Sequence, residues 1–452
     1  MEPTVAQKAH LFDSRPFRVT NWQVLAIAIP MALAYLTTPL LGLVDTAVVG
    51  RFGDVALLGG LATGAVVFDV VLTPFNFLRS GTTGLVAQAF GRGDILEEKA
   101  AFWRAFSVAA TSGLLMVLLS PLIAVTGEWF MQADQPVAAA MDIYIRIRLI
   151  SAPAVLINYA ILGYFLGRGK AALGLLLQLF MNGMNIAFSI VLGIYLDWGI
   201  AGVAWGTVCS EVIAVVAGMA VLVGRFRELP NVPLEHTFSM TAIRRMLQLN
   251  GDIMIRSLAL TGAYILFARQ GAQLGALTLA ANAVLMHVFF AGAYFLDGFA
   301  AAAEQLVGRA VGAFNRPAFS RAVRLTAAWA LALSGFTSIL IFLLGGQLIS
   351  AMTKAADVRA EAVLYLPWAA FAIVSGVLAS QMNAVFIGAA WSRDMRNTML
   401  ISFAAFVAAL FSLGQMFGNH GLWSALHVFL LLRGISLLLV MPRRVRTAFA
   451  ER

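Results

Sequence analysis

Residues 22–49 read WQVLAIAIPMALAYLTTPLLGLVDTAVV and contain one ionisable side chain, Asp45. An apolar run of this length is sufficient for an α-helix to cross a hydrocarbon core of roughly 30 Å. A carboxylate inside such a span costs roughly 2.5 to 3.5 kcal/mol on insertion scales, so it must face a partner or a water-filled cavity and not lipid. The stretch therefore predicts a membrane helix, and Asp45 is the first candidate for a functional residue.

The composition of the whole chain indicates the same environment. Its 452 residues are 61% hydrophobic and 12% charged, with a mean hydropathy of +0.86, whereas soluble domains are about 45 to 50% apolar and 25% charged. The apolar residues come in separate runs of about 18 to 28 residues, the length of membrane helices and not of barrel strands. We predict an all-α polytopic membrane protein with twelve spans, at residues 22–50, 55–78, 103–126, 145–166, 171–196, 199–223, 247–270, 275–298, 325–349, 362–388, 398–417 and 420–441.

The net charge of +9 reflects membrane topology and not an acidic partner such as nucleic acid. Most basic residues outside these spans fall on the side of the N-terminus, and only Arg51, Arg269, Lys354 and Arg359 fall on the other side. The positive-inside rule therefore predicts that both termini are cytoplasmic. The first apolar run is too long for the core of a cleaved signal peptide. Cys209 is the only cysteine, so neither a disulfide framework nor a cysteine metal site is expected.

A weak internal repeat divides the chain into halves. An offset of about 218 residues aligns several pairs, among them Arg51 with Arg269, Gly199 with Gly418 and Gly202 with Gly421. Each half would hold six spans, so both halves begin on the same side and are related by a pseudo-two-fold axis along the membrane normal, as in transporters built from parallel repeats. We predict an N-terminal lobe at residues 1–224, a cytoplasmic linker at 225–246 and a C-terminal lobe at 247–452.

Several motifs occur in an order typical of one transporter family. The first half contains LGLVDTAVVG at 41–50, FLR at 77–79, TTGL at 82–85 and AQAFG at 87–91, and the second half contains DIMIRSL at 252–258, NAVLM at 282–286 and LDGFA at 296–300. Together they resemble the multidrug and toxic compound extrusion (MATE) family, and more narrowly its DinF-like branch, over nearly the whole chain. The resemblance implies a two-lobe antiporter that exports organic cations or amphipathic drugs in exchange for H⁺ or Na⁺.

The cation-coupling cluster of the family maps onto the first half of this chain. The resemblance implies that Asp45 is the acid of the first helix and that Asn185 and Thr207 are polar members of the cluster. Pro30 matches a proline at which that helix bends, since proline removes a backbone hydrogen bond and kinks a helix. Ser189 stands where a second carboxylate is common, and this departure favours proton coupling over a full sodium site.

Helix geometry allows these residues to meet. Asn185 and Ser189 are four residues apart, as are Thr207 and Glu211, so each pair shares one helix face. Measured from the turn between the two helices, Ser189 and Thr207 lie at the same depth. Asp45 lies in the same outer half, and Glu211 can supply the carboxylate that Ser189 lacks. A weak Na⁺ site at Asp45, Asn185 and Thr207 stays open, and no other metal is expected.

This cluster predicts a mechanism that depends on desolvation, which favours the protonated form of a carboxyl group. Proton and substrate would compete for Asp45. Protonation would bend the first helix at Pro30 and shrink the cavity, and deprotonation on the cytoplasmic side would reset it. The expected driving force is the H⁺ gradient, with Na⁺ as the alternative, and no cofactor is expected.

Other intramembrane residues are weaker candidates. Asp69 and the rings of Phe68, Phe188 and Trp205 are candidates for the substrate cavity, the rings through cation–π contacts, although packing explains most such rings.

In the second half we expect a structural charge cluster, in preference to a second coupling site, formed by Asp252, Arg256, Asp297 and Glu304. Asp252 and Arg256 are spaced for an ion pair within one helix. His287 is interpreted as a core histidine in preference to a proton relay. Arg433 needs a counter-charge that the sequence does not identify.

Two other functions stay open. A flippase for a lipid-linked substrate would need a cavity lined by basic residues, whereas the assigned cluster is acidic and polar. A channel or a membrane-embedded enzyme is disfavoured by the two-lobe repeat and by the lack of motifs such as HExxH or GxSxG. The expected partners are small organic cations or drugs and the lipid bilayer, with the protein a monomer in a bacterial inner membrane.

Overall fold

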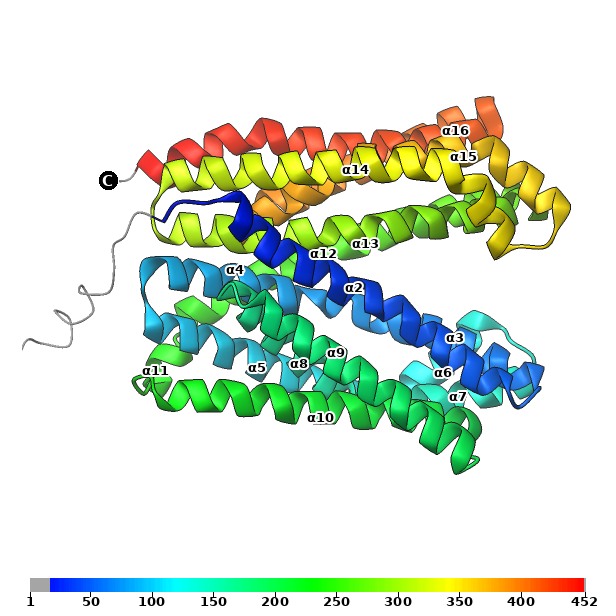
Figure 1. The fold of residues 1–452 in the computed structure, drawn as a ribbon, viewed down its shortest axis with the longest axis horizontal. Helices are drawn as coiled ribbons and strands as arrows, with labels where there is room; N and C mark the ends of the chain where they lie inside the picture. Colours follow the sequence, from blue (N-terminus) through cyan, green and yellow to red (C-terminus); the bar gives the residue numbers. More distant parts are fainter. Residues whose placement is uncertain (1–16, 451–452) are drawn as a thin grey trace, which may run out of the picture. The chain divides into compact units, whose positions relative to one another are not determined.

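The computed structural model describes residues 17–450, and these residues form helices joined by short turns (Figure 1). The elements are α2 (Asn21–Gly50), α3 (Val55–Leu72), η1 (Thr73–Asn76), α4 (Phe77–Arg92), α5 (Ile95–Leu118), α6 (Ser120–Met131), α7 (Gln135–Ile150), α8 (Ala152–Gly167), α9 (Ala171–Phe188), η2 (Ser189–Tyr195), α10 (Gly199–Arg227), α11 (Leu234–Thr237), α12 (Met240–Gln273), α13 (Ala276–Gly312), α14 (Arg316–Met352), α15 (Ala356–Gly388) and α16 (Ser392–Ala450). The described part of the chain contains no β-strand. The all-α prediction is therefore confirmed.

Twelve membrane spans follow from these helices. Within residues 17–450, ten helical segments are long and apolar enough to cross a membrane, and α7 and α8 form an eleventh span with a bend of 50°. The 59-residue α16 contains one non-helical residue, Gly418, at which two helices join. Because a span needs about 20 residues, α16 supplies two spans and the total is twelve.

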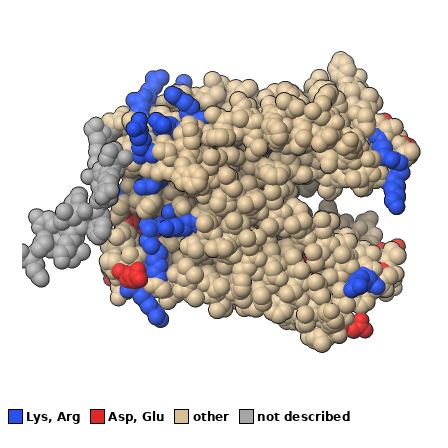
Figure 2. All heavy atoms as spheres, in the orientation of Figure 1, with Lys and Arg blue, Asp and Glu red and all other residues tan. Residues whose placement is uncertain are grey.

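Several helices are longer than the apolar runs that predicted them. The third span was expected from residue 103, but α5 begins at Ile95, where the Asp94 side chain accepts a hydrogen bond from the Glu97 backbone amide at 2.9 Å. The fourth was expected from residue 145, but α7 begins at Gln135. Hydropathy does not detect the start of α5 because Glu97, Glu98 and Lys99 make it polar. In Figure 2 most Lys and Arg side chains on the visible face gather towards one end of the helices, beyond an uncharged middle band.

The chain divides into two compact units. Within the described residues, one unit contains residues 33–90 and 94–246, and the other contains residues 17–32, 91–93 and 247–450. The helix α2 contributes to both, because its residues up to Ala32 belong with the second half and those from Leu33 with the first. The range expected as a linker contains the end of α10, the short α11 and the start of α12, and α11 packs against α5.

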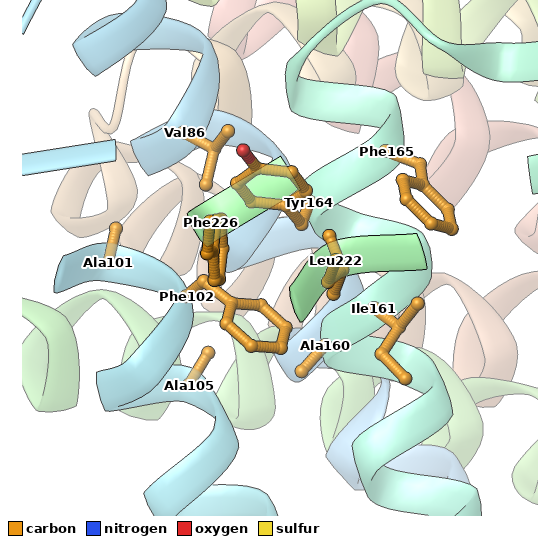
Figure 3. Close-up of a cluster of buried hydrophobic side chains, with 10 residues drawn as sticks. All are labelled: Val86, Ala101, Phe102, Ala105, Ala160, Ile161, Tyr164, Phe165, Leu222 and Phe226. Carbon is orange, nitrogen blue, oxygen red and sulfur yellow. The ribbon is translucent and has the colours of Figure 1, made fainter. Parts of the chain in front are cut away.

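The first unit has an aromatic core between α4, α5, α8 and α10 (Figure 3). The ring of Phe102 packs edge-on against Tyr164 at 5.7 Å and against Phe226 at 5.6 Å between ring centroids. The Tyr164 hydroxyl donates a hydrogen bond to Glu98, and Arg168 forms an ion pair with the same carboxylate. This cluster packs α4, α5, α8 and α10 against one another.

The aligned glycines Gly199 and Gly418 both have a positive φ. Gly199, which begins α10, has φ of +55°, and Gly418 has φ of +54°. In the first unit a Cβ atom at Gly202 would lie 2.5 Å from the carbonyl carbon of Leu192, and in the second unit a Cβ at Gly421 would collide with the Leu413 carbonyl. In each half, the last two spans are therefore joined at a glycine with positive φ, which glycine adopts without steric cost. A second glycine, three residues later, allows the two backbones to come into close contact.

Candidate coupling site in the first lobe

Asp45 lies on α2 beside the start of η2. The Ser189 hydroxyl donates a hydrogen bond to the Asp45 carboxylate at 3.1 Å. The neighbouring residues Val48 and Val49 belong to an apolar cluster that includes Tyr144 of α7 and Val203 of α10. The carboxylate is partly buried, and within residues 17–450 it forms no ion pair. Within the described residues, the half-buried Asp45 carboxylate accepts a hydrogen bond from one hydroxyl group and contacts no positively charged side chain.

The two other polar members of the predicted cluster, Asn185 and Thr207, connect α9 with α10. The Asn185 side-chain amide donates to the Thr207 hydroxyl at 2.8 Å, and Thr207 donates to the carbonyl of Val203. Gly206 lets the two helices approach closely, because a Cβ there would lie 2.7 Å from the Ser189 backbone nitrogen. From Ser189 to Tyr195 the chain is a π-helix, a form that occurs often at functional sites. The side-chain pairing of the cluster is therefore Asp45 with Ser189 and Asn185 with Thr207.

The structure places Glu211 against Arg148 and not against Ser189. The Arg148 Nη1 atom lies 2.9 Å from Glu211 Oε1, and both side chains are 9% exposed. Arg148 also contacts the Tyr144 hydroxyl and lies over the ring of Phe68 at 4.0 Å. The Glu211 carboxylate is consequently neutralised inside the lobe.

Sequence reasoning missed Arg148. It occupies the last turn of α7, just before the bend at Ser151, and Ser151 donates a hydrogen bond to the Arg148 carbonyl. Its guanidinium lies within electrostatic range of both Asp45 and Asp69. The available signal was a basic residue inside the expected fourth span, at residues 145–166, and the tertiary structure shows that it meets Glu211.

The cavity candidates are in different environments. The ring of Phe68 is buried under Arg148, so an internal cation occupies its face. Asp69, the next residue on α3, is exposed. Phe188 and Trp205 are partly buried, and within the described residues neither ring has a cation over it. Asp69 is therefore more accessible to solvent than Asp45. The Phe68 ring already has the Arg148 guanidinium as its cation partner.

In the second lobe, Asp252 connects α12 with α16. Arg396 forms an ion pair with Asp252 at 2.7 Å, and the Ser392 hydroxyl donates to the same carboxylate at 2.7 Å. Arg256 donates to the Ser257 hydroxyl, so the ion pair seen at Asp252 joins two helices. Glu304 is buried and Asp297 is exposed.

Two further residues had been singled out. His287 is exposed on α13, and its Nδ1 atom lies 2.8 Å from the Ala283 carbonyl of its own helix, so it is not in the core. Pro30 lies within α2, which is one continuous helix, two residues before the change from one unit to the other. Proline cannot donate to the carbonyl four residues earlier, so α2 lacks one backbone bond near this boundary.

A sodium site would need oxygen ligands. Asp45 provides a carboxylate and Thr207 a hydroxyl, and the Asn185 side-chain oxygen is buried without a hydrogen-bond partner. Oxygen is the ligand that hard cations prefer. The donor types fit a weakly bound Na⁺, although Ser189 adds no second negative charge. No group of three or more His, Cys, Asp or Glu side chains in residues 17–450 is arranged for a metal ion.

The fold and the polar cluster inside one lobe define a secondary transporter. The MatE family profile matches residues 30–191 and 253–412. DNA damage-inducible protein F of Escherichia coli (strain K12) is 35% identical over 428 residues, covering 93% of this chain and 92% of that protein. The chain therefore belongs to the MATE family of multidrug and toxic compound transporters and resembles its DinF-like branch, as the sequence motifs predicted.

Solved structures show the same fold at low sequence identity. A MATE structure described as the straight conformation has a TM-score of 0.85 at 18% identity and covers 95% of this chain and 96% of its own. One described as the bent conformation has a TM-score of 0.86 at 17% identity and covers 96% and 99%. The predicted twelve-helix, two-lobe fold is thus confirmed. The chain is about equally similar to both conformations.

Proposed function

We propose that this transporter exports amphipathic organic cations in exchange for protons and that Asp45 is shared between proton and substrate. The observation that carries the proposal is the contrast between two acids of one lobe. Glu211 is neutralised by Arg148 at 2.9 Å, whereas Asp45 has a single hydroxyl donor and no ion pair in the described chain. A carboxylate in an apolar lobe can remain there as a neutral acid or bind a cation.

Exchange follows from this competition. When Asp45 is ionised it attracts an organic cation, and when it binds a proton it loses that attraction and the substrate is released. Arg148 lies within electrostatic range of Asp45, but its ion-pair partner is Glu211. Pro30, near the boundary between the units along α2, is the proposed point of bending. Solved MATE structures with the same fold are described as a straight and a bent conformation.

The proposal includes the setting of the protein. We infer a monomer in a bacterial inner membrane with both termini cytoplasmic, supported by the distribution of basic residues and by the similarity to the Escherichia coli protein. The relatives include a multidrug export protein of Staphylococcus saprophyticus that is 20% identical over 189 residues. The acidic character of the cluster argues against a flippase for a lipid-linked anion.

Transport in proteoliposomes tests the proposal. Uptake of a fluorescent cation into vesicles with an imposed pH gradient should be lost in Asp45→Asn, down to the level of empty vesicles. Asp142→Asn is a matched control, because Asp142 pairs with Arg146 near the surface and should transport like wild type. Wild-type uptake by Asp45→Asn would refute the role of this acid.

A sodium gradient separates the two coupling ions. The unpartnered Asn185 oxygen is the observation that favours sodium. Proton coupling predicts no response of the wild type to sodium at constant pH, whereas Ser189→Asp, which restores a second carboxylate, should gain one. A sodium response in the wild type that is lost in Asn185→Leu would establish the alternative.

A further inference from the structure

A second buried arginine, Arg433, forms no ion pair within the described residues. It lies in the second half of α16 and is 6% exposed. Within residues 17–450 its guanidinium forms no ion pair and donates no hydrogen bond, and its Nε atom is fully enclosed without a partner. An arginine side chain keeps its charge under all conditions found in proteins. An unpaired buried charge is strongly unfavourable, so this position needs an explanation.

The contrast with Arg148 shows what is missing. Both arginines are buried within their lobes and both lie near an aromatic ring, Phe68 at 4.0 Å and Phe429 at 5.1 Å. Arg148 has the Glu211 carboxylate at 2.9 Å. No carboxylate of the described residues forms an ion pair with Arg433.

Aromatic side chains lie near Arg433. Tyr264 of α12 lies within electrostatic range, and its ring packs edge-on against Phe290 of α13 at 5.2 Å. On the other side, Gly434 lets α16 approach the backbone of α15 at Ala379. Aromatic walls and one cation are the usual features of a site for an amphipathic molecule.

The depth of Arg433 excludes a lipid headgroup at the membrane surface. The residue is fifteen positions after Gly418 and ten before Arg443, along continuous helix. At 1.5 Å per residue these are roughly 22 Å and roughly 15 Å. The guanidinium therefore lies deep in the hydrocarbon region, where an anion arrives only as part of a bound molecule.

We propose that Arg433 is the anchor of an anion subsite in the second lobe and that it binds the carboxylate of an amphipathic organic substrate. Arginine binds carboxylates through paired hydrogen bonds. This inference deepens the proposed export function, because it adds organic acids and zwitterions to the organic cations assigned to Asp45.

Thermal stability of the ligand-free protein tests the unpaired charge directly. Arg433→Met removes the charge and keeps an apolar stem, so it should raise the melting temperature of the purified full-length protein by a few degrees. Arg148→Met should lower it, because it leaves Glu211 unpaired. An unchanged or lower melting temperature for Arg433→Met would overturn the proposal, since Arg433 would then have a structural partner.

A pair of dyes tests the ligand class. Rhodamine B carries a carboxylate beside its cationic rings, and its ethyl ester has the same rings without that negative charge. Wild type should bind rhodamine B about tenfold or more tightly than Arg433→Met does, with no change for the ester, and Arg433→Lys should recover part of the loss. The exposed Arg146 provides the matched control, Arg146→Gln, which should bind both dyes like wild type.

The outcomes separate this proposal from the function on which it rests. Equal losses for both dyes in Arg433→Met, or equal affinities in all variants, would overturn the anion subsite. Failure of the wild type to bind or export the ester would overturn organic cation export. The melting temperature of Arg433→Met would still show whether the buried charge at Arg433 lacks a partner. Repeating the binding in nanodiscs of phosphatidylglycerol and of phosphatidylcholine shows whether a lipid anion occupies the site instead of the substrate carboxylate. A lipid anion would weaken rhodamine B binding only in phosphatidylglycerol.

Discussion

Glu211→Gln removes the only carboxylate in contact with Arg148 in the described chain and keeps the size of the side chain. Both members of the pair are 9% exposed, and loss of one partner from a buried pair costs about 3 to 5 kcal/mol. The Phe68 ring and the Tyr144 hydroxyl remain on the guanidinium, which favours the lower end. At about 3 kcal/mol, a unit of roughly 200 residues should lose about 6 to 12 °C in melting temperature.

The assay is thermal unfolding of the purified full-length protein in detergent, carried out as a double-mutant cycle. Arg148→Met should destabilise by a similar amount, and the double variant should be less destabilised than the sum, with an interaction energy of about 1 to 3 kcal/mol. Asp142→Asn, at a surface ion pair, should leave the melting temperature unchanged. Additive effects, or a loss below about 1 kcal/mol for Glu211→Gln, would refute a buried pair that stabilises the first lobe.

Glycine substitutions test the close helix contacts. Gly206→Ala should destabilise the protein by about 1 to 3 kcal/mol through overpacking, because its Cβ would lie 2.7 Å from the Ser189 backbone nitrogen. The same variant should reduce proton-driven efflux. Gly183→Ala, with open space around it, should change neither the melting temperature nor efflux. Gly418→Ala should cost about 1 to 2 kcal/mol because φ there is +54°. Gly414→Ala lies in regular helix with no neighbour within 4 Å and should stabilise slightly. Equal melting temperatures within either pair would contradict the assigned contact or turn.

Several parts of the candidate site could be inferred from the sequence. Asp45 stands out because a carboxylate in an apolar span is costly, and the four-residue spacing of Asn185 and Ser189 places both on one helix face. The family motifs then predicted the fold of the whole chain, which similarity over 93% of its length supports. Spacing did not show that Asn185 bonds Thr207 while Ser189 bonds Asp45, because the choice depends on how closely Gly206 brings α10 to η2.

The sequence by itself determined the solvent of the protein, its helical class and its family, because these depend on apolar run length and on local motifs. Only the tertiary structure decided the pairing of charges. Glu211 and Arg148 are 63 positions apart in the chain, and no local pattern specifies a contact between residues so far apart. The same holds for Arg433, because whether a buried charge has a partner is a property of all helices packed around it and not of its neighbours in sequence.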